Sequence, residues 1–212
     1  MDLDVYSDVV CPWCYLGHRR LATAIARMGS DGEGIRLRWR AFQLDPRATA
    51  QPGDLRAALE RKYGPGSFEA MGERLGALGA DAGIDYRFDI ALRVGTFDAH
   101  RLIQWAQATD RPRVDALTER LFRAYFTEGA NVADHPTLIG LADDVGLDAA
   151  TAGELLVSRS FADEVMTDRA EAIESGITGV PAVAYNGATL IPGAQDTDTM
   201  ETILRRLHAK VG

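Results

Sequence analysis

Cysteine is scarce in this chain of 212 residues, which contains only Cys11 and Cys14. A structural zinc site needs about four ligands, usually from a second cysteine pair or two close histidines. The four histidines are scattered singly, and only His18 is near the cysteines in sequence. We therefore expect no bound metal. An inert pair of buried cysteines is an alternative interpretation of the spacing.

Basic residues and long apolar runs are also in short supply. The 23 Lys and Arg against 31 Asp and Glu give a net charge of −8, which argues against nucleic acid or an anionic membrane as a partner. No run approaches the roughly 18 apolar residues of a transmembrane helix, and the first residues lack the basic and apolar parts of a secretory signal. These absences predict a cytoplasmic protein. Persistent disulfides are rare in the cytosol, so we expect the cysteines to be catalytic.

What the chain does have is a Cys-Pro-Trp-Cys motif at residues 11–14, between an apolar run at 3–10 and an amphipathic one at 14–27. The first run predicts a buried strand and the second a helix. A strand that leads into a helix places Cys11 at the positive end of the helix dipole, which favours the reactive thiolate. Cys14, one turn along, can resolve a mixed disulfide formed at Cys11. The motif therefore predicts a dithiol for electron exchange.

Strand and helix patterns follow one another along the rest of the chain. Residues 35–44 alternate between apolar side chains and Arg36, Arg38 and Arg40, which predicts a strand with its arginines on a solvated face. Further on, Asn186-Gly187 is a typical hairpin turn. The predicted helices are 54–63, 67–80, 97–109, 113–128, 136–145, 149–157, 161–175 and 197–210, and the predicted hairpin strands are 182–185 and 188–191. The expected N-caps are Ser67, Thr96, Asp148 and Ser160.

The order of these elements is strand, helix, strand, helical block, hairpin and helix. It is typical of an α/β protein with a thioredoxin-like fold, in which a central mixed sheet carries a large helical insertion. We expect residues 1–50 and 176–212 to form a discontinuous thioredoxin-like domain and residues 51–175 to form an inserted all-helical cap. The two parts of the sheet domain would then meet in space beside the cysteines.

A second half of the site is indicated by a Gly-Val-Pro sequence that ends in Pro181, immediately before the hairpin. Proline at the entrance of a strand has a positional role. A cis Val180–Pro181 bond would turn the Val180 backbone outward, where it can pair with an incoming extended chain. A trans proline that ends a loop is the alternative. We predict that Val180 and Pro181 bind substrate beside the cysteines.

Together these residues resemble the DsbA-like thioredoxin-fold oxidoreductases, and more narrowly their cytoplasmic FrnE-type branch. The resemblance covers nearly the whole chain, because further segments match that branch in the same order. These segments are Phe42-Gln43-Leu44, the run 96–102, the run 124–129 and Gly193-Ala194-Gln195. The resemblance implies that Cys11 is an exposed nucleophile, Cys14 a buried resolving thiol, and Pro181 a cis-proline that faces the pair, with Val180 pairing with the substrate backbone.

Two departures limit what the resemblance implies. Periplasmic relatives carry a signal sequence and usually a histidine between the cysteines, where this chain has Trp13. We therefore do not expect a potential as oxidising as about −120 mV. Some FrnE-type chains have a second cysteine pair near the C-terminus, and this sequence has none, which excludes a relay through such a pair.

The leading hypothesis is a thiol–disulfide oxidoreductase that acts on a protein disulfide or a small-molecule thiol substrate through a mixed disulfide at Cys11. It needs no bound cofactor, and glutathione or another thiol would be the redox partner. Pro12 and Trp13 are expected at the rim. His100 is a further substrate-binding candidate, with a purely structural histidine as the alternative. We expect Asp8 to be an exposed carboxylate at the strand end.

Two other functions stay open. The same superfamily contains kappa-type glutathione transferases and 2-hydroxychromene-2-carboxylate isomerases, which would use glutathione and a small aromatic or polyketide-like substrate. A glutathione-supported isomerase can lose Cys14, whereas a dithiol cycle cannot. The third function is a chaperone or partner-binding module that uses the cap surface. The sequence indicates no particular oligomeric state.

Overall fold

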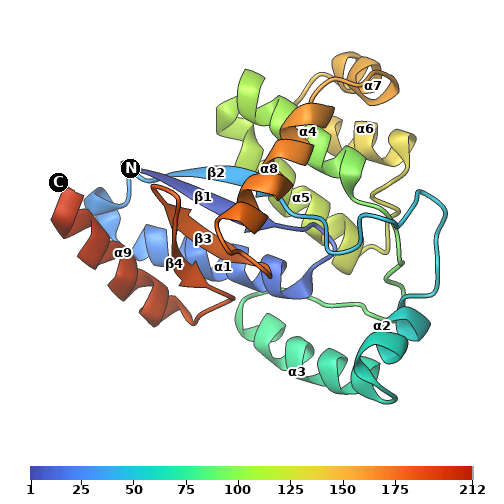
Figure 1. Ribbon diagram of the computed structural model, residues 1–212, viewed down its shortest axis with the longest axis horizontal. Coiled ribbons are helices and arrows are strands. Elements are labelled where there is room, and N and C mark those ends of the chain that lie inside the picture. The colour runs from blue at the N-terminus through green and yellow to red at the C-terminus, as the bar shows by residue number, and fades with distance from the viewer. Residues whose placement is uncertain (212) are drawn as a thin grey trace.

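A four-stranded mixed sheet forms the centre of the computed structural model, which describes residues 1–211 (Figure 1). The strand order is β2-β1-β3-β4. Strand β1 (Asp2–Ser7) pairs in parallel with β2 (Arg36–Ala41) and antiparallel with β3 (Ala182–Tyr185). Strand β3 pairs antiparallel with β4 (Ala188–Pro192). This is the mixed sheet that the sequence predicts, with the helical block inserted between β2 and β3.

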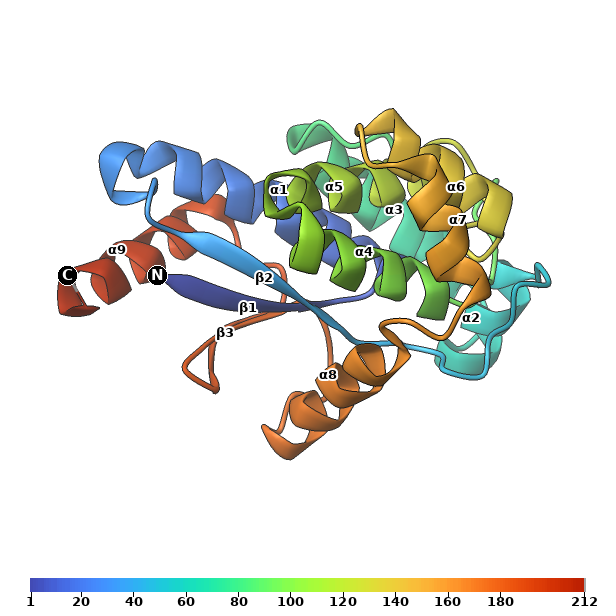
Figure 2. The same ribbon diagram turned by 90° about the horizontal axis from the view of Figure 1, so that it is seen from above.

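Helices flank both faces of the sheet. Helices α1 (Pro12–Arg27) and α9 (Thr197–Val211) pack together on one side, and α8 (Ala162–Glu174) packs against β2 from the other side (Figure 2). Helix α4 (Phe97–Thr109) contacts both β2 and α8. The other helices are α2 (Leu55–Tyr63), α3 (Ser67–Asp81), α5 (Val114–Phe126), α6 (His135–Asp144) and α7 (Ala149–Val157), with 3-10 turns at Gly29–Asp31 and Arg111–Arg113.

Strand β1 ends earlier, and helix α1 begins earlier, than the sequence predicts. Strand β1 ends at Ser7 rather than at residue 10, and α1 begins at Pro12, so that Cys11 is its N-cap (φ −92°, ψ 113°). Proline suits the first helical position because its φ is preset and the missing N–H would have no helical partner there. The turn at residues 8–10 therefore sets where the first cysteine lies.

Two of the four predicted N-caps, Thr96 and Asp148, occupy the cap position. The other two, Ser67 and Ser160, are wrong. Helices α3 and α8 begin after Gly66 and Phe161, whose backbones are left-handed (φ 77° and 60°). A left-handed residue turns the chain into the helix without a side-chain cap, and glycine takes this conformation with little strain.

One apolar core joins the sheet to the helical insertion. It contains Leu16 of α1, Trp39 of β2 and Phe122 of α5, all of them buried. A smaller cluster on the opposite sheet face packs Tyr6 of β1 against Ala172 of α8. The helices between β2 and β3 thus share the core of the sheet. The division into 1–50 with 176–212 and a cap at 51–175 stays a prediction, and position 212 lies outside the described residues.

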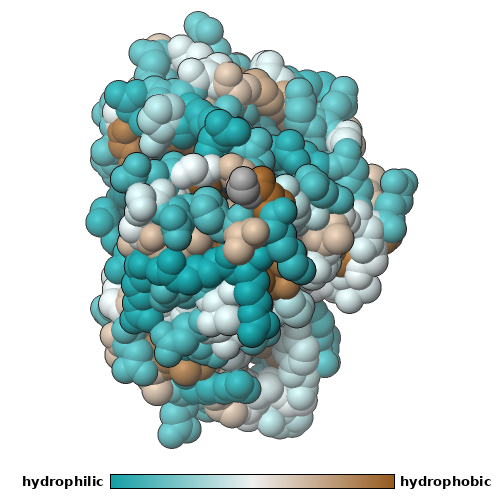
Figure 3. All heavy atoms as spheres, turned by 90° about the vertical axis from the view of Figure 1, so that its left-hand side faces the viewer, coloured by the Kyte–Doolittle hydropathy of each residue, from teal (hydrophilic) through white to brown (hydrophobic). Residues whose placement is uncertain are grey.

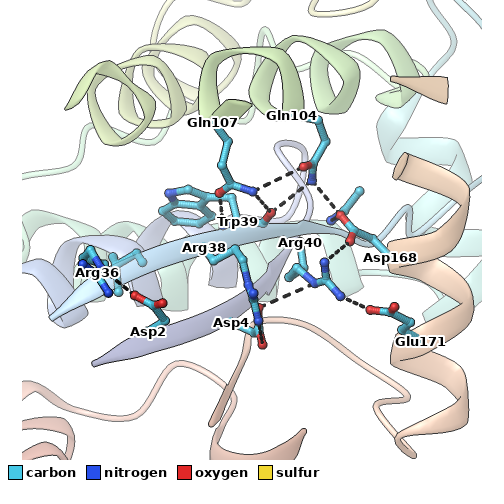
Figure 4. Close-up of polar contacts among 12 residues, drawn as sticks. Asp2, Asp4, Arg36, Arg38, Trp39, Arg40, Gln104, Gln107, Asp168 and Glu171 are labelled. Atoms are coloured by element: carbon cyan, nitrogen blue, oxygen red, sulfur yellow. Dashed lines mark hydrogen bonds and ion pairs between the residues drawn. The ribbon is translucent and has the colours of Figure 1, made fainter. Parts of the chain in front are cut away.

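The arginines of β2 differ in their surroundings. Arg36 and Arg38 are exposed, as predicted for a solvated face, and pair with carboxylates of β1. Arg40 does not follow the prediction, because its side chain is only 20% exposed and its Nη1 lies 2.8 Å from Asp168 Oδ1 of α8 (Figure 4). The period-two pattern cannot indicate that α8 packs over this end of β2.

The face that carries the N-terminus and the end of α9 is mostly hydrophilic, and the apolar side chains visible on it form separate areas (Figure 3). Scattered apolar side chains of this kind are ordinary on protein surfaces. Among the helices of residues 1–211, none is both long enough and apolar enough to cross a bilayer.

Candidate active site

Both cysteines lie at the N-terminal end of α1. The Cys11 N–H donates to the Asp8 carbonyl (3.0 Å), and the Cys11 carbonyl accepts from the Cys14 N–H (3.0 Å). The Cys11 side chain makes no capping hydrogen bond to the helix, so no backbone N–H holds its sulfur. The turn and the first helical turn therefore fix both cysteine backbones.

Val180 and Pro181 lie beside Cys11, although they are 169 and 170 positions further along the chain. The Cys11 Sγ donates to the Val180 carbonyl oxygen at 3.7 Å, and the Val180–Pro181 peptide bond is cis. Gly17 of α1 allows this approach, because a Cβ at that position would stand 3.0 Å from Pro181 Cγ. The structure therefore brings together the two halves of the site that the sequence indicates.

Residues of the helical insertion cover the motif. The Tyr86 hydroxyl donates to the Pro12 carbonyl (2.5 Å), and the Arg74 guanidinium lies over the Trp13 ring, 5.1 Å from its centroid. Burial, and after it the neighbouring Cys11, raise the pKa of the Tyr86 hydroxyl, which therefore remains a donor. Tyr86 and Arg74 form a roof that sequence reasoning missed, since no local signal links them to the cysteines.

The resemblance implies an exposed Cys11, and this expectation is wrong for the structure. Cys11 is only 4% exposed. Its sulfur faces Val180, and Tyr86 is bound to the next residue of the motif. Only a slim group can reach the sulfur in this arrangement.

Cys14 is buried as expected, with 2% of its surface exposed. Burial raises the pKa of its thiol well above the usual range, and the neighbouring Cys11 sulfur adds to the rise. The Asp8 backbone N–H and the Ser7 hydroxyl act in the opposite direction. Little Cys14 thiolate is therefore present at neutral pH.

The expectation that Asp8 is an exposed carboxylate is also wrong, because its side chain is only 1% exposed. Its Oδ2 accepts from the Leu44 N–H (2.7 Å), and its Oδ1 lies 3.3 Å from His100 Nε2 of α4. His100 is buried and lines a cavity of about 10 Å³ together with Ser7. The structure therefore places His100 in the interior beside Asp8, which precedes Cys11 by three residues.

Other parts of the described chain add no second centre of this kind. Within residues 1–211, no three His, Cys, Asp or Glu side chains gather as metal ligands. An open groove of about 270 Å³ lies between α1, α3 and the start of α9, and its lining includes Arg20 and Asp198 but none of the predicted site residues. The chemistry is therefore concentrated at the start of α1.

Comparison with known families agrees with this geometry. The family model described as DSBA-like thioredoxin domain matches residues 2–205. The chain belongs to this family. The family-level prediction is thus confirmed, and the narrower FrnE-type assignment stays a prediction.

Individual relatives of this DSBA-like domain cover nearly all of its length. The uncharacterized protein YwbO of Bacillus subtilis is 29% identical over 201 residues, which are 94% of this chain and 93% of the relative. The probable DsbA oxidoreductase SCO1869 of Streptomyces coelicolor has a TM-score of 0.90 at 32% identity and covers 100% of this chain and 92% of its own. The cytosolic disulfide reductase DsbM of Pseudomonas aeruginosa has a TM-score of 0.73 at 19% identity over 100% of both chains, and this likeness shows the fold alone.

Proposed function

We propose that this DSBA-like domain is a thiol–disulfide oxidoreductase that exchanges disulfides through Cys11 and Cys14. The observation that carries the proposal is the position of Cys11, at the N-cap of α1 with its Sγ 3.7 Å from the Val180 carbonyl oxygen. The helix N-terminus favours the thiolate at this position. Cys14, one turn along and buried, is placed to resolve the mixed disulfide.

The reaction needs only the two thiols and a substrate disulfide. The Cys11 thiolate attacks one substrate sulfur, and the other substrate sulfur leaves as a thiol. Cys14 then attacks the Cys11 sulfur, which forms the enzyme disulfide and releases the second substrate thiol. The substrate gains two electrons and the domain loses two. A thiol such as glutathione reverses these steps and regenerates the dithiol.

The roof over Cys11 favours a small thiol or disulfide as the partner. With Cys11 4% exposed and Tyr86 bonded to Pro12, a folded protein surface has little room to reach the sulfur. Pro12, Trp13, Val180 and Pro181 line the approach and would bind the partner there. We place the domain in the cytoplasm, with glutathione or a similar thiol as redox partner, and with no resident metal, cofactor, nucleic acid or membrane.

The glutathione-dependent isomerase is the second candidate, and the same roof suits a small ligand. It differs from the first in its dependence on Cys14, since an isomerase that uses bound glutathione needs no resolving thiol. The burial of Cys14 within one turn of Cys11 supports the dithiol cycle.

The deciding experiment equilibrates the protein in glutathione buffers and counts thiols by trapping, with Cys14→Ser as the control. We expect a reversible two-electron transition between about −280 and −120 mV, absent from the control. If no Cys11–Cys14 disulfide forms at any ratio of reduced to oxidised glutathione, the oxidoreductase is wrong. Isomerase assays that retain activity in Cys14→Ser would then support the second candidate.

A further inference from the structure

The segment that ends in Val180 and Pro181 lies opposite Cys11 without a strand partner of its own. The pairing of β3 with β1 ends at Ala182, one residue after Pro181. In the described chain, the Cys11 thiol makes the one hydrogen bond to residues 178–180. The position of Val180 opposite the sulfur therefore depends on what holds Pro181.

Pro181 is held through its carbonyl oxygen, which accepts from the Gly193 N–H at 2.8 Å. Proline has no N–H, so its carbonyl is the only backbone group through which a hydrogen bond can hold it. Gly193 opens a turn at residues 193–195, in which the Gln195 N–H donates to the Gly193 carbonyl at 3.1 Å. The Gln195 side chain closes the turn, because its Nε2 donates to the Pro192 carbonyl at 2.7 Å. This turn therefore carries the anchor of Pro181.

Arg20 of α1 binds the turn directly. Its Nη1 donates to the Ala194 carbonyl at 3.0 Å and to the Gln195 carbonyl at 3.4 Å. The side chain is half-buried, and hydrogen bonds from a charged donor are stronger than those between neutral groups. Its neighbour Arg19 pairs with Glu119, whereas no carboxylate of the described chain pairs with Arg20. The Arg20 guanidinium is thus committed to the turn.

The same face of α1 also contacts Pro181. Gly17 lies three residues before Arg20, a spacing that places both on one side of the helix. A Cβ at Gly17 would stand 3.0 Å from Pro181 Cγ and 3.6 Å from Ala194 Cβ. Because Cys11 is the N-cap of this helix, the bonds made by Arg20 fix the turn, and with it Pro181, relative to the reacting sulfur.

We propose that Arg20 is a positioning residue, which acts through the turn at 193–195 to hold Val180 and Pro181 opposite Cys11; this role rests on the proposed function. In the first step the Cys11 thiolate attacks one sulfur of the substrate disulfide. A bond forms between these two sulfurs, and the disulfide bond breaks with its electron pair leaving on the other substrate sulfur. The three sulfurs have to be in line, and Val180 and Pro181 form the wall along which the substrate lies. A shift of this wall slows the attack without changing the nucleophile.

The test compares two reactions of Cys11 in Arg20→Met, made in a Cys14→Ser background where Cys11 is the one remaining thiol. The reactions are mixed-disulfide formation with oxidised glutathione and alkylation by iodoacetamide, both stopped with acid and counted by mass spectrometry. Per folded molecule, we expect the first to slow about tenfold, because the wall moves, and the second to stay within about twofold. Iodoacetamide is attacked at one carbon and needs no alignment of two sulfurs. The uncharged bis(2-hydroxyethyl) disulfide should show the same loss as oxidised glutathione, because the effect comes from position and not from the missing charge.

Arg27→Met is the matched control. Arg27 lies seven residues after Arg20 on α1 and lines the same groove, but its side chain binds Asp198 of α9 at 2.7 Å rather than the turn. The control removes the same charge, so both reactions should keep the rates of the parent protein.

Three results would overturn the proposal: an unchanged rate of mixed-disulfide formation in Arg20→Met, equal slowing of alkylation, or an equal loss in Arg27→Met. If Arg20→Met does not fold, Gln195→Ala serves instead, since it removes the bond that closes the turn. We expect it to slow mixed-disulfide formation about threefold, and an unchanged rate there also overturns the proposal. A parent protein that reacts with iodoacetamide but with neither disulfide contradicts the proposed function instead.

Discussion

Helix α4 presents two polar side chains, one turn apart, to two buried carboxylates with different surroundings. His100 meets Asp8 next to the thiols, at 3.3 Å. Gln104 Nε2 donates to Asp168 Oδ2 at 2.6 Å, on the side where α8 meets β2 (Figure 4). The same Asp168 oxygen accepts from the Ala41 N–H at 2.9 Å.

The two carboxylates differ in whether a partner can change its charge. Asp168 pairs with Arg40, at 2.8 Å, and an arginine keeps its charge at every physiological pH. Asp8 pairs with a histidine, the side chain that titrates closest to neutral pH. The Asp168 side is thus a permanent clamp between α8 and the sheet, whereas Asp8 lies in the turn that leads into the thiol motif and accepts from the Cys11 N–H through its carbonyl. Substitutions on the Asp168 side should therefore lower the stability of the fold, whereas substitutions on the thiol side should change the rate of disulfide exchange.

Among the variants that test this contrast, Asp168→Ala should have the largest effect on stability. It leaves the Ala41 N–H and the Gln104 amide without their acceptor and removes a charge partner of Arg40. We expect the free energy of unfolding to fall by about 3 kcal/mol. Urea unfolding measures the loss. The rate of oxidation by glutathione, per folded molecule, should stay within about twofold of the wild type, since no reacting group moves.

Asp168→Asn is the matched variant for this prediction. Its amide oxygen can still accept from the Ala41 N–H, so the loss should be about 1 kcal/mol. A large drop in redox rate with intact stability, in either variant, would show that the clamp takes part in the chemistry and that the contrast is wrong.

On the thiol side, Gly17→Ala should change chemistry and leave stability nearly unchanged. The new Cβ would stand 3.0 Å from Pro181 Cγ, so Pro181 and Val180 must shift away from Cys11 by a few tenths of an ångström. The better helix propensity of alanine, about 1 kcal/mol, offsets the strain of this contact. We expect the first reaction of Cys11 with oxidised glutathione to slow roughly fivefold, measured by acid-quenched time courses in which mass spectrometry counts the glutathionylated protein.

Gly76→Ala is the control for helix propensity. Gly76 lies in α3, and its new Cβ would have no heavy atom of the described residues within 4 Å beyond its own helix backbone and chain neighbours. This variant should gain about 1 kcal/mol of stability and keep the wild-type rate. If Gly17→Ala also keeps the wild-type rate, the position of Pro181 does not limit the attack by Cys11.

Sequence reasoning reached the fold because burial alternation and helical periodicity are local. The order of strands and helices, the hairpin at 182–192 and the start of α4 at Phe97 follow from patterns of about ten residues. Element ends were less well predicted. The extra residues assigned to β1 belong to the turn at 8–10, where apolar side chains pack into the core without strand pairing.

The site was predicted only where a local motif marks it. The cysteine spacing and the proline before the hairpin indicated Cys11 and Val180, which do meet. The burial of Asp8 depends on a histidine 92 positions later, and the burial of Cys11 involves Tyr86, bound to a carbonyl 74 positions earlier. No pattern within one sequence couples positions so far apart, so a carboxylate at a strand end was expected in solvent.

A third carboxylate, Glu119 of α5, gives a smaller test based on pH. Its Oε1 accepts from the Tyr15 hydroxyl at 2.9 Å, and its Oε2 lies 3.2 Å from His18 Nε2. Burial alone would raise the pKa of Glu119, but its pairing with His18, helped by Tyr15 and Arg19, holds the pKa below the ordinary 4.5. At Asp168 the balance is opposite, since burial prevails and raises the pKa above the ordinary 3.8.

The opposite pKa shifts of Glu119 and Asp168 predict that their contributions to stability change with pH in opposite directions. Because the folded protein keeps Glu119 ionised at lower pH than the unfolded chain does, the stabilisation is complete above pH 4.5 and is lost as pH falls through the folded-state value. We expect Glu119→Gln to be less stable than the wild type at pH 7 by up to about 1 kcal/mol, and this difference should shrink toward about pH 3.5. For Asp168→Asn the sign reverses, because ionisation of a carboxyl with a raised pKa weakens the fold as pH rises from 3.8. The stability that Asp168→Asn loses relative to the wild type should therefore be larger at about pH 3.5 than at pH 7. Urea unfolding of both variants at the two pH values measures these differences. If the losses of Glu119→Gln and Asp168→Asn changed in the same direction with pH, the contrast between the two carboxylates would be wrong.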